Sequence, residues 1–225
     1  MPRKSLWPWF AGMSGIVLSA AWLFIDAPAG FATGVSANQS SSTERSVAMD
    51  RTKFWKIIEH TKPLEADSDA QAAALRTELD RLAPVQIVAF EATFDQIMRE
   101  SYSWDLWGAT FVVHGGASDD GFEYFRVWLI SKGRAVYETV LKDPDSLADL
   151  LAADSIGPLE FEQFAYIARE AWAAKTGHDA GQMPDAAAMM YPGVEPTGEP
   201  LQENEAHLAK RYPKLWKRFG HNPVQ

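Results

Sequence analysis

The sequence predicts an all-α fold, an irregular multi-helix bundle with a docked C-terminal helical tail. From residue 50 onward, apolar side chains recur every three or four residues, the period of a helix with one buried face. Helix start and stop signals divide this pattern into short segments. No long run alternates apolar and polar residues, and "ATFVVHGG" at residues 109–116 is the only stretch that could form a strand. Hydrophobic residues make up 47% of the 225, enough for a sizeable core.

Start signals define three helices between residues 50 and 100. Asp50 can cap the first helix. Ser68 and Gln71 fit the S-x-x-Q capping box of a second helix. Pro84 suits the first turn of a third helix. The side chains expected to face the core are Phe54, Ile57, Ile58, Ala72, Leu75, Leu79, Leu82, Ile87, Phe90, Phe94, Ile97 and Met98.

Five more helices are predicted between residues 103 and 177. Ser103 caps a helix that Gly115 ends, and Ser118 caps the next, which stops before Gly133. The remaining ones are a segment over 134–141, a helix capped by Asp143 with Pro144 first, and a long helix from after Gly157-Pro158 to Gly177. Their inward residues are Leu106, Thr110, Val113, Phe122, Phe125, Leu129, Val136, Tyr137, Val140, Phe161, Phe164, Ala165, Ala168 and Trp172.

Composition divides the chain into four parts. These are an apolar leader with a polar linker over 1–48, a helical domain over 49–177, a Pro/Gly-rich linker over 178–202 and a basic helical tail over 203–225. Pro213 divides the tail into a kinked helix or two short ones. The tail residues expected to dock on the domain are Leu208, Tyr212, Leu215, Trp216 and Phe219.

The leader leaves three alternatives open. The 20 uncharged residues from Leu6 to Ile25 are long enough to span a bilayer as an anchor helix. Small residues ending at Ala29 or Ala37 fit a cleaved signal peptide instead. The abrupt start of the globular pattern at Met49 fits a third case, in which translation begins there. We expect a membrane-anchored protein if Met1 is the start and a cytoplasmic one if Met49 is.

Charge and composition exclude several function classes. A net charge of -9 argues against nucleic-acid binding, and the absence of cysteine removes disulfides, thiolate nucleophiles and cysteine zinc sites. The sequence has no P-loop and no dinucleotide-binding glycine motif, so no cofactor is predicted. The tail from His207 onward carries +5, leaving -14 on the rest, so it either folds back on the body or forms a patch for an anionic partner.

The candidate polar site is the corner "HGGASDDGFEYFR" at residues 114–126. Its structural interpretation needs no ligand, because acids in a first helical turn and a histidine at a helix end complement the helix dipole. Its functional interpretation is a divalent-cation site of a metal-dependent hydrolase-like enzyme, formed by His114, Asp119, Asp120 and Glu123. The full candidate set is Asp105, His114, Ser118, Asp119, Asp120, Glu123 and Arg126, with Glu123 and Arg126 expected to pair.

A second candidate surface is aromatic. Tyr124 and Trp128 stand four residues apart on the same helix face, away from the predicted core stripe. With Trp104 and Trp107 they could form an exposed groove for a partner helix. The favoured function is therefore a protein-interaction or binding module with an unknown protein partner, and the metal-dependent enzyme is the alternative.

Several segments together resemble a known bacterial family, the domain-of-unknown-function family 4240. They are "FW" at Phe54, "SWDLWGA" from Ser103, "GGASDDGFEYFRVWLISKGR" from Gly115, "DPDSLA" from Asp143 and "RYPKLWKRFG" from Arg211. The likeness runs from Met49 to about Gly220 and implies a helical domain, usually cytoplasmic, without an established activity. Many members resemble this chain but carry cysteine where Ala117 stands, so no thiol chemistry carries over.

Overall fold

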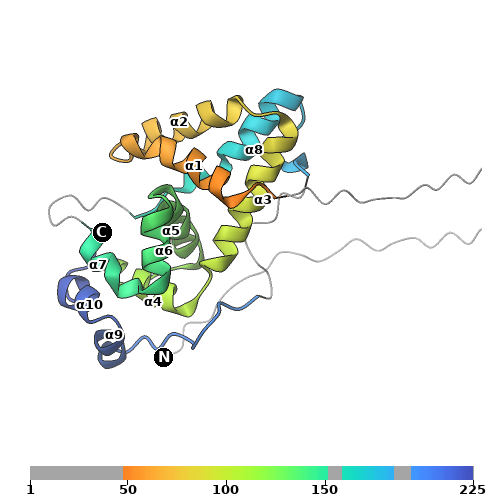
Figure 1. Ribbon diagram of the computed structural model, residues 1–225. Coiled ribbons are helices and arrows are strands. Elements are labelled where there is room, and N and C mark those ends of the chain that lie inside the picture. Colours follow the sequence, from red (N-terminus) through yellow and green to blue (C-terminus); the bar gives the residue numbers. More distant parts are fainter. Residues whose placement is uncertain (1–47, 152–158, 185–193, 225) are drawn as a thin grey trace, which may run out of the picture. The chain divides into compact units, whose positions relative to one another are not determined.

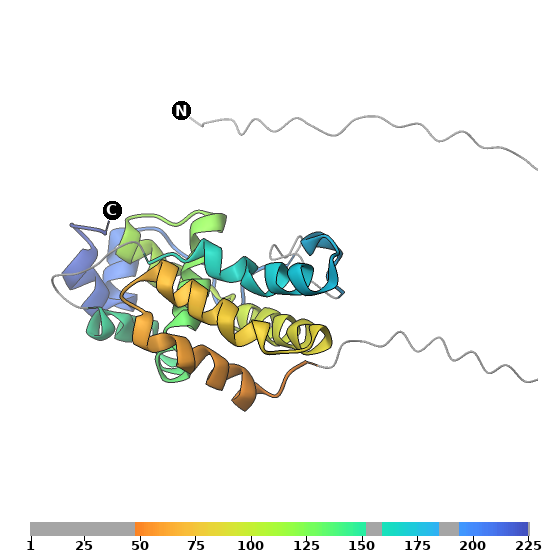
Figure 2. The same ribbon diagram turned by 90° about the horizontal axis from the view of Figure 1, so that it is seen from above.

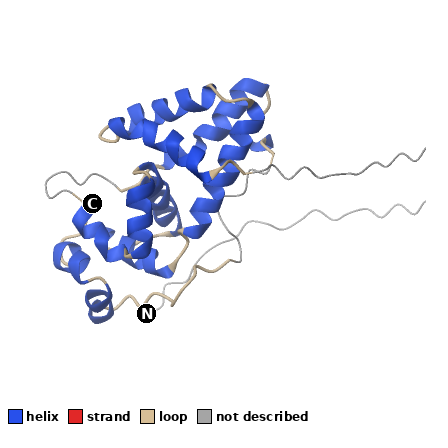
Figure 3. Cartoon of the chain, in the orientation of Figure 1, coloured by secondary structure: helices blue, strands red, loops and turns tan. Residues whose placement is uncertain are grey.

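The computed structural model describes residues 48–151, 159–184 and 194–224, and this part of the chain is helical (Figure 1, Figure 3). The leader, including the stretch from Leu6 to Ile25, lies outside the described residues. Within the described residues, no helix is long and apolar enough to span a bilayer. The helices are α1 Arg51–Thr61, α2 Ser68–Asp80, α3 Pro84–Glu100, α4 Trp104–His114, α5 Asp119–Ser131, α6 Arg134–Lys142, α7 Leu147–Leu150, α8 Glu162–Thr176, α9 Glu205–Arg211 and α10 Pro213–Phe219. Short 3-10 turns, η1 Lys62–Leu64, η2 Pro144–Ser146 and η3 Ala180–Gln182, join some of them.

Local capping explains why most helices begin where the sequence predicts. The Asp50 carboxylate accepts from the Lys53 backbone N–H at 3.1 Å, and Pro84 is the first residue of α3. The capping box predicted at Ser68 and Gln71 is wrong, because Asp67 caps α2 one residue earlier and accepts from the Ala70 N–H at 3.0 Å.

Gln71 has a tertiary role instead of a capping role. Its buried side-chain amide donates to the Thr61 hydroxyl at 3.1 Å and to the Ser131 carbonyl at 2.9 Å. These hydrogen bonds join α1, α2 and α5, which a helix-end motif cannot reveal.

The core is one cluster to which every helix from α1 to α10 contributes buried residues, and α8 packs against α2, α3 and α5. The inward-facing residues predicted from periodicity are buried, except Leu82, Val136 and Trp216, which are partly buried against the same cluster. The segment "ATFVVHGG" belongs to α4 and the turn after it rather than to a strand. Among the described residues, β pairing is limited to one bridge between Ser103 and Thr197.

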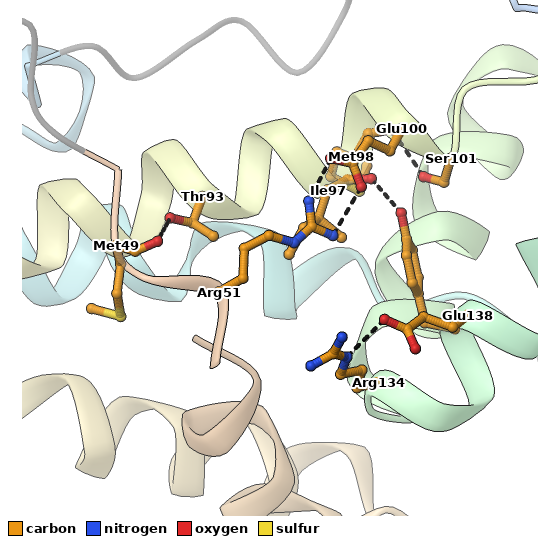
Figure 4. A network of polar contacts seen from close by, with 10 residues as sticks. Met49, Arg51, Thr93, Ile97, Met98, Glu100, Ser101, Arg134 and Glu138 are labelled. Atoms are coloured by element: carbon orange, nitrogen blue, oxygen red, sulfur yellow. Dashed lines mark hydrogen bonds and ion pairs between the residues drawn. The ribbon is translucent and has the colours of Figure 1, made fainter. Parts of the chain in front are cut away.

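Polar contacts fasten the start of α1 to α3 (Figure 4). The Met49 carbonyl accepts from the Thr93 hydroxyl at 2.9 Å, and Arg51 forms an exposed ion pair with Glu100. Tyr137 of α6 also donates to the Ile97 carbonyl at 2.7 Å, so α3 is the common support of both elements.

The predicted tail consists of two short helices, α9 and α10, that meet at Tyr212 and Pro213. They lie at the end of the bundle away from the C-terminal end of α8 (Figure 1, Figure 2). α10 packs on α4, α7 and η2. Its first N–H groups, those of Lys214 and Leu215, donate to the buried Asp145 carboxylate at 3.1 and 2.9 Å.

The basic tail folds back on the acidic body. Arg211 pairs with Asp105, Lys214 pairs with Asp149 at 2.5 Å, and Arg218 donates to the Ala148 carbonyl. Fold-back was one of the two alternatives for this +5 segment.

Candidate functional site

The corner between α4 and α5 is built around Gly115. This residue ends α4 in the left-handed conformation, with φ of 69°, and the N–H of Gly116 donates to the Phe111 carbonyl at 3.0 Å. A Cβ on Gly115 would also lie 2.8 Å from Cγ of Pro223. Glycine is therefore required here both for the turn and for close approach of the tail.

The start of α5 agrees with the structural interpretation of the acids. The Ser118 hydroxyl caps α5 by accepting from the Gly121 N–H at 3.1 Å. Asp119 and Asp120 follow in the first turn and are exposed. In this position they stabilise the helix through its dipole.

A cavity of about 350 Å³ opens at this corner. The residues that line it are His114, Gly116, Ala117, Ser118, Gly121, Glu160 and Val224. Of the predicted polar set, the structure brings His114 and Ser118 to the cavity. Glu160 and Val224 were not predicted, because they come from segments far from the corner in sequence.

His114 is half-buried, and its Nε2 is shielded from solvent without a hydrogen-bond partner. Burial lowers the pKa of His114 below its ordinary value, and the nearby Glu160 carboxylate opposes that shift. The lowered pKa favours the neutral imidazole over the partial positive charge expected at the end of α4.

Ser118 and Glu160 both place a side-chain oxygen close to Gly121. A Cβ on Gly121 would lie 3.2 Å from the Ser118 Oγ and 3.5 Å from Oε1 of Glu160. The missing side chain at Gly121 thus leaves one hydroxyl and one carboxylate oxygen facing the same space.

Half of the predicted aromatic groove supports the cavity loop. Trp107 stacks on Trp104 and on Phe122, with ring centroids 5.3 and 4.6 Å apart. Its indole N–H donates to the Ala117 carbonyl at 3.3 Å. The stack therefore fixes a residue of the cavity wall, although Trp107 itself is not in the lining.

The other half of the aromatic set lies on a different face of α5. Tyr124 is two positions from Phe122, so the two side chains point in nearly opposite directions. The Tyr124 hydroxyl donates to Glu162 of α8 at 2.9 Å, and Trp128 stacks on Phe125 at 5.5 Å. The structure thus brings Trp104 and Trp107 together and places Tyr124 beside α8.

Like Asp119 and Asp120, the three remaining members of the predicted polar set lie outside the cavity lining. Asp105 lies in the first turn of α4 and pairs with Arg211, so it is at the opposite end of that helix from His114. Glu123 and Arg126 are buried, and burial raises the pKa of Glu123, while the charge of Arg126 opposes the rise. Nη1 of Arg126 donates to the Met98 carbonyl at 2.8 Å.

Sequence reasoning missed a buried ion pair near these two residues. Arg169 of α8 bonds Glu91 of α3 at 2.6 Å, and Glu91 is 2% exposed. Burial raises the pKa of Glu91, and Arg169 opposes the rise. Glu91 falls among the inward-facing residues of α3, and a charge at such a position was the available signal.

The predicted metal site is not assembled in the described part of the chain. No three or more histidine, aspartate or glutamate side chains among those residues are grouped to hold one ion. What the described corner offers is a small cavity with a neutral imidazole, a hydroxyl and a carboxylate.

The comparisons place the chain in a family. Comparisons with curated proteins and with solved structures gave no match. The family described as "Protein of unknown function (DUF4240)" matches residues 49–174, which hold every helix from α1 to α7 and most of α8. The chain therefore belongs to the DUF4240 family, as the resemblance from Met49 onward predicts.

Proposed function

We propose that this domain is a binding module whose corner cavity receives a primary ammonium group. The observation that carries the proposal is the cavity itself, which is lined jointly by the Glu160 carboxylate, the Ser118 hydroxyl and the His114 imidazole.

The charges at the corner favour a cation. Glu160 supplies a carboxylate, the neutral His114 supplies no opposing charge, and Asp119 and Asp120 stand next to Ser118. An anion would meet these acids before it reached the cavity. An ammonium group, in contrast, offers three donors to the carboxylate and hydroxyl oxygens.

The size of the cavity limits the ligand. About 350 Å³ is at the lower end of the range for small-molecule sites. A short alkyl amine fits this volume, and so does the end of a lysine side chain. The shared chemistry has two possible sources, a free amine or a lysine of a partner protein.

The test titrates butylammonium, butyrate and butanol into the protein and follows the His114 imidazole signals by NMR. The three probes have similar size and differ in charge. Butylammonium is expected to shift the His114 signals saturably and the other two are not. Glu160→Gln should weaken binding about fivefold, the equivalent of about 1 kcal/mol for an exposed charge pair.

Glu162→Gln is the matched control, because it makes the same change two residues away in a carboxylate that bonds Tyr124 outside the cavity lining. Equal effects of the two variants, or a preference for butyrate, would contradict the proposal. A lysine-containing blocked tripeptide distinguishes the sources. Tighter binding of the tripeptide than of butylammonium favours a partner protein, and weaker binding favours a free amine.

A further inference from the structure

One wall of the corner cavity comes from the end of the tail. Val224 lines the cavity, and its N–H donates to the Val113 carbonyl at 2.8 Å. Val113 lies in the last turn of α4, where carbonyl groups lack partners within the helix. Pro223 meanwhile rests against Gly115, so the segment 222–224 covers the end of α4.

The tail helices fix the position of this segment. The Asn222 N–H donates to the Phe219 carbonyl at 3.0 Å, which turns the chain back toward α4 directly after α10. Phe219 and Leu215 are buried in the core cluster. Because α10 is held by buried apolar residues, the segment can change its contacts without release of the helices.

We propose that the segment 222–224 is the specificity-determining wall of the cavity, which limits the length of the bound ligand and seals His114 from water. The part of this inference that concerns ligand length rests on the proposed function. The part that concerns exclusion of water from His114 does not. Val224 contributes in two separable ways, through the bulk of its side chain and through its backbone N–H.

Two variants separate these contributions. Val224→Gly removes the side chain and keeps the N–H, whereas Val224→Pro keeps apolar bulk and deletes the donor to Val113. Val194→Gly is the control, because Val194 is 56% exposed and outside the cavity lining. The readouts are the His114 titration followed by NMR and the relative affinities of butylammonium and hexylammonium.

Both Val224 variants are expected to raise the pKa of His114 toward its ordinary value, because water reaches the ring, and Val194→Gly should leave it unchanged. Val224→Gly should also favour hexylammonium over butylammonium relative to the native protein, by up to about fourfold per added methylene. If the His114 titration is unchanged in both Val224 variants, the proposal that the segment 222–224 shields His114 from water is wrong. If no ammonium probe binds the native protein, the proposed ligand fails, while the titration still decides whether the segment seals the cavity.

Discussion

The buried ion pair between Glu91 and Arg169 allows a sharp prediction for Arg169→Met. This change leaves the Glu91 carboxylate without its 2.6 Å partner at a site where the Glu91 side chain is 3% exposed. Breaking a buried pair from one side costs about 3–5 kcal/mol, because one charge stays desolvated. That is a large part of the roughly 5–15 kcal/mol that stabilises a typical domain.

The cost should depend on pH. Burial already raises the pKa of Glu91 and Arg169 counteracts it, so loss of Arg169 raises the pKa further. A group whose pKa is higher in the folded than in the unfolded protein contributes its full stability at pH values below the unfolded pKa. That contribution is lost as the pH rises through the folded pKa. The free energy of unfolding of the Arg169→Met protein should therefore be closest to that of the native protein near pH 4.5, and the difference should grow toward pH 7.

Urea denaturation at several pH values from 4.5 to 7 measures this cost. Arg134→Met is the control, because Arg134 and Glu138 form an exposed pair worth at most about 1 kcal/mol. Glu91→Gln combined with Arg169→Met should recover much of the lost stability. A cost below about 1 kcal/mol at pH 7, or one that does not vary with pH, would refute the argument that the pair is held in a desolvated core.

Three other changes test the remaining electrostatics. Glu123→Gln should gain unfolding free energy relative to the native protein as pH rises from 4.5 to 7, because the raised pKa of Glu123 makes its ionised form costly in the fold; a difference that does not vary with pH would contradict this. Asp145→Ala should cost about 1.5–3 kcal/mol in urea denaturation, because it leaves the two N–H groups at the start of α10 without their acceptor, while Asp149→Ala at the exposed pair with Lys214 should cost clearly less. Asp120→Ala should lower thermal stability by only about 0.3–1 kcal/mol, the contribution of a first-turn acid, and a loss several times larger would point to an undetected role.

Local signals made the helices predictable. Ser103, Gly115 and Ser118 act on backbone groups a few residues away, so the ends of α4 and the start of α5 follow from short stretches of sequence. Apolar periodicity likewise identified the buried faces. The capping error at α2 shows the limit, because Gln71 is recruited by Thr61 and Ser131, which lie outside the motif.

The site was predictable only in part. His114 and Ser118 belong to the corner itself, but Glu160 and Val224 reach it through packing of α8 and the tail, which no local pattern encodes. The aromatic set was split for a similar reason. Helical periodicity places Tyr124 and Trp128 on one face of α5, but it does not say which neighbouring helix covers that face.

A crystal structure of the protein soaked with butylammonium tests the central claim most directly. The account predicts the ammonium nitrogen in the corner cavity at about 3 Å from a Glu160 oxygen, with the alkyl chain against Val224. A cavity that stays empty while the amine binds elsewhere, or a bound amine that avoids Glu160, would contradict it.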